Sequence, residues 1–111
     1  MDKALLSGST GMLILRLLDG QDLYGYQMIE TLRSQSDHTF DLKAGTLYPL
    51  LHTLEERGFV SSYLEGADSA RPRKYYHLTV SGKAQLLRQE EEWRQYARAV
   101  EKVLRGGASL A

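Results

Sequence analysis

The chain has 111 residues, of which 14 are basic, 14 are acidic and none is cysteine. This length allows one domain with a modest core and leaves no room for a second catalytic lobe. Without cysteine the chain can form no disulfide and no thiolate metal site, so we expect a cytoplasmic protein. Its apolar runs are far shorter than the roughly 20 residues of a membrane span, so we expect no membrane segment.

The neutral net charge hides an uneven distribution along the chain. Between Ser69 and Gln89 there are five basic residues and no acid, whereas the first 41 residues hold three basic residues and six acids. A local basic patch matters more to a polyanion than the total charge does. This pattern makes a nucleic acid a candidate partner.

The first third of the chain predicts two helices joined by a short turn. A dense apolar run follows Ser9 and Thr10, which are suited to cap a helix, and Gly20 is suited to end it. Because the apolar residues lie almost all round, this first helix is expected to be buried. A second helix is expected over about residues 24–34, where Gly25 would let a neighbour approach closely.

The third helix shows the clearest periodicity, after a polar connecting segment. Its leucines follow the spacing of an amphipathic helix without a miss, at Leu47, Leu50, Leu51 and Leu54. Gly58 is expected to end this helix in a left-handed conformation, and Pro49 to lie near its start, where a missing N–H costs least. The outward face carries Thr46, Tyr48, Pro49, His52 and Thr53.

The rest of the chain predicts a hairpin and one long helix. Two β-prone runs, residues 60–65 and 73–78, flank a polar tip. Thr79 then caps a helix over about residues 80–104, which would be roughly 37 Å long.

The expected fold is therefore mostly α, of the α+β class: a winged helix-turn-helix with a long C-terminal dimerisation helix. We expect a DNA-binding domain over residues 1–79, the dimerisation helix over 80–105 and a flexible tail over 106–111.

The third helix has the properties of a helix that enters the major groove of DNA, with one face to anchor it and one to read with. Thr46 and Tyr48 are candidates to donate hydroxyls to phosphates, while His52 and Thr53 are placed to reach base edges. The alternative is that Tyr48 packs on the domain and Thr46 caps the helix.

The hairpin tip adds cations in the right order along the chain. Arg71, Arg73 and Lys74 flank or follow Pro72, and cations on a β-hairpin can straddle a minor groove and pair with phosphates. The alternative is a solvated basic loop. The third helix, which is suited to enter the major groove, comes before the hairpin, and this order disfavours the alternative.

The last helix carries an apolar stripe that a small core has difficulty covering. The stripe consists of Leu86, Trp93, Ala97, Val100 and Leu104. Pairing of two chains along this stripe would cover its apolar surface and is the favoured interpretation. The alternative is that the stripe folds back onto the core of its own chain. Two Trp93 indoles in such a dimer would flank a gap suited to a flat aromatic ligand, unless Trp93 only fills the interface.

The sequence gives little support for an enzymatic function. The three histidines, His38, His52 and His77, show no metal-ligand spacing. Ser81-Gly82-Lys83 lacks the first glycine and the final Ser or Thr of a phosphate-binding loop. We expect no catalysis, no metal and no cofactor.

Two motifs resemble the PadR family of bacterial transcriptional regulators. One is Gly45-Thr46-Leu47-Tyr48-Pro49-Leu50-Leu51, and the other is Arg73-Lys74-Tyr75-Tyr76-His77-Leu78-Thr79. Tyr24-Gly25-Tyr26 matches the second helix of the family, and the resemblance covers nearly the whole chain.

The resemblance implies a homodimer that represses transcription from a palindromic operator and releases it when a small aromatic effector binds. The single terminal helix resembles the short members, some of which sense multiple drugs beside a Trp, and Trp93 stands at that position. The family commonly has Lys or Arg where this chain has His52 and Thr53, so the wing must supply more of the attraction to phosphates. Such a regulator is expected in the bacterial cytoplasm, associated with the nucleoid when bound to DNA.

A second hypothesis is an interaction module that binds protein through the winged-helix surface, without sequence-specific DNA binding. The basic wing favours the DNA-binding regulator, whereas the cation-poor third helix favours the module. A gel-shift assay with the DNA upstream of the protein's own gene separates the two.

Overall fold

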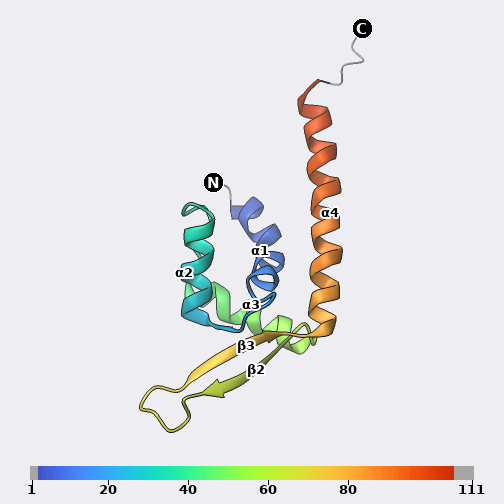
Figure 1. Cartoon of the computed structure of the whole chain (residues 1–111). Coiled ribbons are helices and arrows are strands. Elements are labelled where there is room, and N and C mark those ends of the chain that lie inside the picture. Colours follow the sequence, from blue (N-terminus) through green and yellow to red (C-terminus); the bar gives the residue numbers. More distant parts are fainter. Residues whose placement is uncertain (1–2, 107–111) are drawn as a thin grey trace.

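The computed structural model describes residues 3–106, with side chains from Gly8 onward (Figure 1). Its elements in chain order are α1 (Lys3–Leu17), β1 (Leu23–Tyr24), α2 (Gly25–Gln35), α3 (Ala44–Glu56), β2 (Val60–Glu65), β3 (Arg73–Leu78) and α4 (Val80–Leu104). The architecture is a winged helix-turn-helix with one additional long helix, which confirms the expected fold class.

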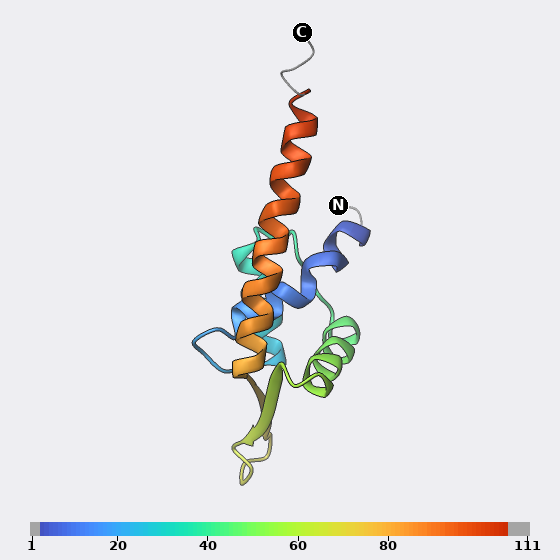
Figure 2. The same ribbon diagram turned by 90° about the vertical axis from the view of Figure 1, so that its right-hand side faces the viewer.

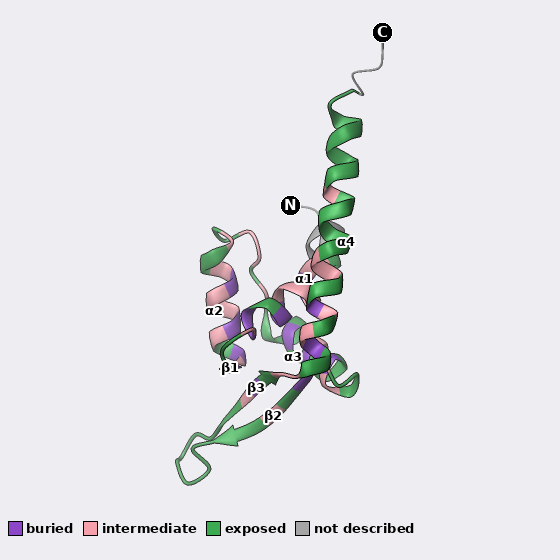
Figure 3. Cartoon of the chain, turned by 45° about the vertical axis from the view of Figure 1, so that its right-hand side comes forward, coloured by how far each residue is buried: buried purple, intermediate pink, exposed green. Residues whose placement is uncertain are grey.

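The core lies where α1, α2, α3 and the base of α4 meet (Figure 3). Its largest fully buried side chains are Ile14, Leu15, Leu18, Met28, Leu47, Leu51, Val60 and Leu86. Among the leucines of α3, Leu54 is buried as well and Leu50 is half-buried against the cluster. The periodicity of α3 thus predicted its anchoring face.

The sheet has three antiparallel strands in the order β1-β3-β2. The bounds of β2 and β3 agree with the two β-prone runs, and Val60 opposite Leu78 sets their register. Strand β1 was not expected from the sequence. It has only two residues, and Leu23 pairs with Tyr76 while Tyr24 pairs with Tyr75.

Two local expectations were wrong. Ser9 and Thr10 do not cap α1 but lie inside it, because the segment of high helix propensity that precedes them carries the helix back to Lys3. Pro49 is not in the first turn of α3 but is its sixth residue, so the bond from residue 49 to the carbonyl of Gly45 is missing. Gly45 is exposed, where water can satisfy that carbonyl.

Other terminal signals of the helices were confirmed. Gly58 follows α3 with a φ of 79°, in the left-handed region. Thr79 precedes α4, and its hydroxyl accepts a hydrogen bond from the backbone N–H of Gly82 at 3.0 Å. Residues 107–111 of the expected tail lie outside the described residues.

Helix α4 leaves the domain. Its first half lies along α1, and its second half extends beyond the other elements, as two perpendicular views show (Figures 1 and 2). The described chain accordingly measures 70 × 28 × 21 Å. The hairpin projects at the opposite end of the molecule from the C-terminal end of α4.

Candidate nucleic-acid interface

The helix-turn-helix is closed by a tight contact between α2 and α3. Gly25 is the first residue of α2, and the ring of Tyr48 lies directly against it. A Cβ atom at position 25 would stand 2.7 Å from the Cζ atom of Tyr48 and closer still to its hydroxyl. Gly25 therefore permits the close approach expected of it, and Tyr48 packs on the domain while its side chain stays half exposed.

The outward face of α3 is exposed, as its pattern predicted. Thr46, Pro49, His52 and Thr53 are all exposed to solvent. Thr46 is the third residue of α3 and does not cap it, because Lys43 occupies the N-cap position.

The outward face of α3, which would contact DNA, carries a negative charge at the C-terminal end of the helix. Nε2 of His52 lies 3.5 Å from Oε1 of Glu56, with both side chains largely exposed. The hydroxyl of Thr53 donates to the carbonyl of Pro49 at 3.2 Å. The helix thus offers hydroxyls and an imidazole to a groove, but no cation from its own residues.

The hairpin of β2 and β3 is the wing of the fold, and its three candidate cations, Arg71, Arg73 and Lys74, have different surroundings. Arg71 is exposed at the tip of the hairpin. The guanidinium carbon of Arg73 lies 4.7 Å from the ring centroid of Tyr24, so this side chain is laid along the sheet. Nζ of Lys74 lies 3.9 Å from Oε1 of Glu55 and 5.6 Å from the ring centroid of Tyr76.

Lys74 is therefore connected to the end of α3 as well as to the wing. Glu55 also accepts a hydrogen bond of 2.6 Å from the hydroxyl of Ser62 in β2. This carboxylate joins the reading helix to both strands of the hairpin and offsets part of the charge of Lys74. Arg71 and Arg73 are left as the wing cations without a carboxylate partner among the described ion pairs.

A row of tyrosines crosses one face of the sheet, one from each strand. The ring centroids of Tyr24 and Tyr75 are 5.3 Å apart in an edge-on arrangement, and those of Tyr75 and Tyr63 are 5.8 Å apart and stacked. The hydroxyl of Tyr63 donates to Asp22 at 2.7 Å, and Nδ1 of His77 lies 2.8 Å from the other oxygen of that carboxylate.

The hydrogen bond from Tyr63 and then the one from His77 lower the pKa of Asp22. The hydrogen bond between Tyr63 and Asp22 also raises the pKa of Tyr63 to about 12. Sequence reasoning did not single out Asp22 or Tyr63. No sequence signal could have paired them, because they are 41 residues apart and on different elements.

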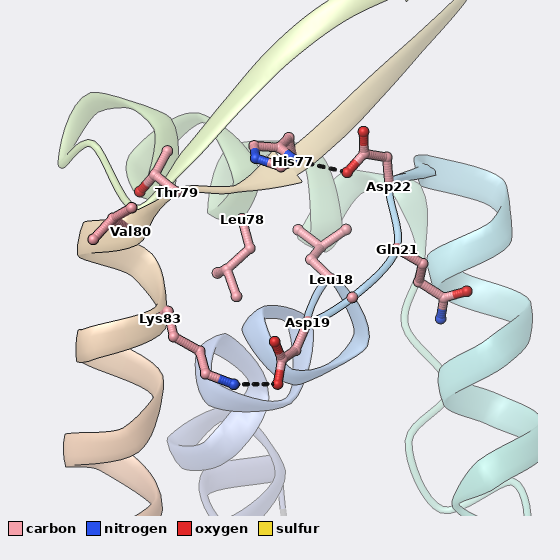
Figure 4. Close-up of a pocket in the computed structure, with 10 residues that line it drawn as sticks. Leu18, Asp19, Gln21, Asp22, His77, Leu78, Thr79, Val80 and Lys83 are labelled. Carbon is pink, nitrogen blue, oxygen red and sulfur yellow. Dashed lines mark hydrogen bonds and ion pairs between the residues drawn. The ribbon is translucent and has the colours of Figure 1, made fainter.

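A cleft of about 610 Å³ lies between the turn after α1, the end of β3 and the first turn of α4 (Figure 4). The Asp22–His77 contact lines one side, and an ion pair of 2.6 Å between Asp19 and Lys83 lines the other. The hydrogen bond from Lys83 lowers the pKa of Asp19. The Asp19–Lys83 pair fastens the base of α4 to the end of α1.

The expected dimerisation stripe of α4 divides into two parts. Leu86 is completely buried in the core of its own chain, so the fold-back alternative applies to it. Ala97 is half-buried, whereas Trp93, Val100 and Leu104 are 51%, 36% and 74% exposed. Beyond the domain, the chain does not cover its own stripe.

The surroundings of Trp93 form a small groove between α1 and α4. Its volume is about 280 Å³, and it is lined by Met12, Leu13, Arg16, Glu90, Trp93 and Arg94. The sequence had not singled out Tyr96, whose ring centroid lies 6.2 Å from that of Trp93 and whose side chain is 61% exposed. Two adjacent aromatic rings therefore stand on the uncovered side of α4.

Two findings concern other kinds of site. Among the side chains that the structure describes, no group of three or more His, Cys, Asp or Glu is arranged to hold a metal ion. In the same part of the chain, no helix has the length and apolar content that crossing a membrane requires.

An exposed helix of a helix-turn-helix, followed by a cation-bearing β-hairpin, defines the class of winged-helix DNA-binding proteins. Comparison with known proteins narrows this class. The model of the transcriptional regulator PadR-like family matches residues 14–88.

Similar proteins agree with this match over most of the chain. A solved transcriptional regulator from Clostridium thermocellum is 29% identical, with a TM-score of 0.84 over 90% of this chain and 97% of that one. A PadR family transcriptional regulator from Eggerthella lenta is 35% identical, with a TM-score of 0.80 over 91% and 86%. The transcriptional regulator Rv3488 of Mycobacterium tuberculosis is 37% identical over 65 residues, which are 59% of this chain and 60% of that protein.

The chain belongs to the PadR-like family of transcriptional regulators. This membership confirms the resemblance seen in the two sequence motifs. It also confirms the expectation of a DNA-binding regulator of transcription rather than an enzyme.

Proposed function

We propose that this protein is a homodimeric, ligand-responsive repressor that binds a palindromic operator and leaves it when a small aromatic effector binds. Residues 1–79 would bind DNA, and the helix over 80–105 would join two chains. The protein would act in the cytoplasm, at the nucleoid while it is bound. The uncovered stripe at the far end of α4, held on a DNA-binding domain, is the observation that carries the proposal.

The DNA contact would be divided between α3 and the wing. The exposed hydroxyls and imidazole of α3 suit base edges and phosphates, but α3 has no cation of its own. Arg71 and Arg73, which lack a described carboxylate partner, would supply most of the phosphate attraction, and Lys74 less because of its neighbour Glu55. Tyr48 would present its exposed edge from a ring fixed on α2.

The dimer follows from the stripe, and the palindrome follows from the dimer. Trp93, Val100 and Leu104 expose apolar surface on a helix that extends past its domain. Two such helices cover each other best when related by a two-fold axis. Two reading helices related by that axis require two inverted half-sites in the DNA.

The effector would bind beside Trp93. In a two-fold dimer the groove at Trp93 faces its symmetry mate, and a flat ring between two indoles gains about 0.5–1.5 kcal/mol per ring pair beyond the area it buries. The ligand regulates only if it binds the geometry that is unsuited to DNA more tightly than the other.

The DNA contact is tested by fluorescence anisotropy with labelled DNA from upstream of the gene, at several salt concentrations. Arg73→Ala should weaken binding to all sequences alike and lower the salt slope by about one for each phosphate that the variant no longer neutralises. His52→Ala or Thr53→Ala should instead change the order of preference among operator variants. The matched control is Arg105→Ala, which removes a cation at the far end of α4 that is paired with Glu101.

If the wing and α3 variants all bind DNA as the control does, the winged-helix contact is wrong. The protein would then act as an interaction module.

The effector is tested through the single Trp of the chain. Planar dyes and phenolic acids should quench the fluorescence of Trp93 saturably and release the DNA. Trp93→Ala should abolish the release and leave the dimer intact. If no such compound quenches saturably, Trp93 only fills the interface.

A further inference from the structure

The pairing between the hairpin and the strand that leads into α2 is short. Strand β1 contributes only Leu23 and Tyr24 to the sheet. Tyr24 is also the N-cap residue of α2, so the start of the helix-turn-helix is attached to β3 through these two residues. Side chains that reinforce this attachment therefore contribute, beside the contacts of Glu55 with Ser62 and Lys74, to how firmly the hairpin is oriented relative to α2.

Asp22 provides such a reinforcement at the entrance to β1. It continues the register of β1 by one residue and faces His77, since Leu23 pairs with Tyr76. Its carboxylate accepts a hydrogen bond of 2.7 Å from Tyr63 in β2 and lies 2.8 Å from Nδ1 of His77 in β3. Figure 4 shows the contact with His77 at the rim of the cleft.

We propose that Asp22 is a positioning residue for DNA binding, which holds the hairpin at the angle where its cations meet the DNA backbone. The inference rests on the proposed contact between the wing and DNA. One carboxylate joins the segment before α2 to both strands of the wing. We call the contacts of Asp22 with Tyr63 and His77 the bracket. Arg73 and His77 lie on the same face of β3 because they are four positions apart, so Arg73 and the bracket share one side of the sheet.

The chemistry of the bracket suits a permanent fastening. The Tyr63 hydroxyl is protonated at neutral pH, as for any tyrosine, and its hydrogen bond to Asp22 raises its pKa further, to about 12. The pKa of Asp22 is lowered, so its carboxylate is ionised at the same pH. Hydrogen bonds to an ionised acceptor are stronger than neutral ones.

The charge of Asp22 gives the test a clear sign. An acid on a DNA-binding face repels phosphate, so its removal should strengthen binding if electrostatics alone matter. The positioning role predicts the reverse, because a loosened hairpin loses its orientation. Asp22→Asn should therefore bind the operator roughly tenfold more weakly at constant salt. Tyr63→Phe, which changes no charge, should also weaken it.

Glu65→Gln is the matched control. Glu65 is an exposed acid at the end of β2, opposite Arg73 in the sheet, and its side chain makes no hydrogen bond or ion pair among those found in the described residues. Its replacement also removes one negative charge, in this case from the hairpin itself, and should leave the affinity unchanged or raise it. A loss of affinity with Asp22→Asn and no loss with Glu65→Gln separates positioning from repulsion.

A second measurement reports the hairpin directly. The chain has no cysteine, so Ala70→Cys allows one dye to be attached at the hairpin tip. In time-resolved anisotropy, the amplitude of fast motion should increase with Asp22→Asn and with Tyr63→Phe, and not with Glu65→Gln. Thermal unfolding shows which variants fold. If Asp22→Asn does not fold, the test is made with Tyr63→Phe alone.

The outcomes distinguish this inference from the proposed function. If Arg73→Ala leaves DNA binding unchanged, the wing contact itself is wrong. If Arg73→Ala weakens binding while both bracket variants bind as wild type does, with an unchanged dye signal, Asp22 does not position the wing.

Discussion

Gly82 fixes the base of α4 against the segment that precedes β2, and its replacement should have a large effect. A Cβ at this position would lie 2.7 Å from Cδ1 of Leu78 and 2.9 Å from the carbonyl carbon of Phe59, with the carbonyl oxygen closer still. Ordinary contacts of a Cβ begin at 3.4 Å. That oxygen also accepts the backbone N–H of Thr79 at 3.1 Å, so it cannot withdraw without losing a hydrogen bond.

The expected cost of Gly82→Ala is the difference of two terms. Overpacking of a rigid site costs about 3 kcal/mol at the upper end of its usual range. The gain in helix propensity from Gly to Ala returns about 1 kcal/mol. The net loss of about 2 kcal/mol corresponds to a fall in Tm of roughly 8–16 °C for a domain of this size.

Differential scanning fluorimetry at one fixed protein concentration measures the shift, because the Tm of the proposed dimer would depend on concentration. The control is Gly8→Ala, since Gly8 lies inside α1 with nothing within 4 Å of its added Cβ. This variant should be more stable by about 0.5–1 kcal/mol. A Gly82→Ala protein that unfolds at the wild-type temperature would refute the close packing of α4 on Phe59.

Three further results are expected. Gly25→Ala should displace the Tyr48 ring and destabilise the fold, and in a Tyr48→Ala background it should not; urea unfolding of the four proteins gives the coupling, about 1 kcal/mol, and zero coupling would contradict the contact. The lowered pKa of Asp19 means that its ionised form stabilises the folded chain, a contribution present above about pH 4 and lost as the pH falls through the folded pKa. The Tm difference between wild type and Asp19→Asn should therefore shrink between pH 6 and pH 3, and a constant difference would exclude this linkage. Replacing Val100 and Leu104 by Glu should give monomers in light scattering, while an intact dimer would place the interface elsewhere.

The long elements could be predicted because each carries its own local signals. Strands β2 and β3 have the bounds expected from the two β-prone runs. Helix α3 ends before Gly58, and helix α4 follows the Thr79 cap, as expected. Strand β1 carries no such signal, because two residues become a strand only through pairing with β3. The start of α1 was misplaced because good cap residues occur inside a helix when the segment before them also favours one.

The candidate interface was predictable in its exposed face and not in its supports. Amphipathic spacing is enough to tell which residues of α3 point outward. Asp22 meets Tyr63 and His77 across 41 and 55 residues, and Glu55 reaches Lys74 from another element. Such contacts depend on how the elements pack, which no spacing in the chain records.

The junction between the wing and α4 determines how the proposed dimer would respond to an effector. Only Thr79 separates β3 from α4, and four hydrogen bonds hold it. Its N–H donates to Phe59, its hydroxyl donates to Gly58 and accepts from the N–H of Gly82, and its carbonyl accepts from the N–H of Lys83. A residue fixed in this way does not act as a hinge, so the hairpin and the base of α4 move as one body. A rotation of about 5° along a helix roughly 37 Å long displaces its end by about 3 Å, which is more than a hydrogen bond to a phosphate tolerates. A small change in the crossing of the two α4 helices, made by a ligand beside Trp93, would therefore be sufficient to take both wings out of register with the operator.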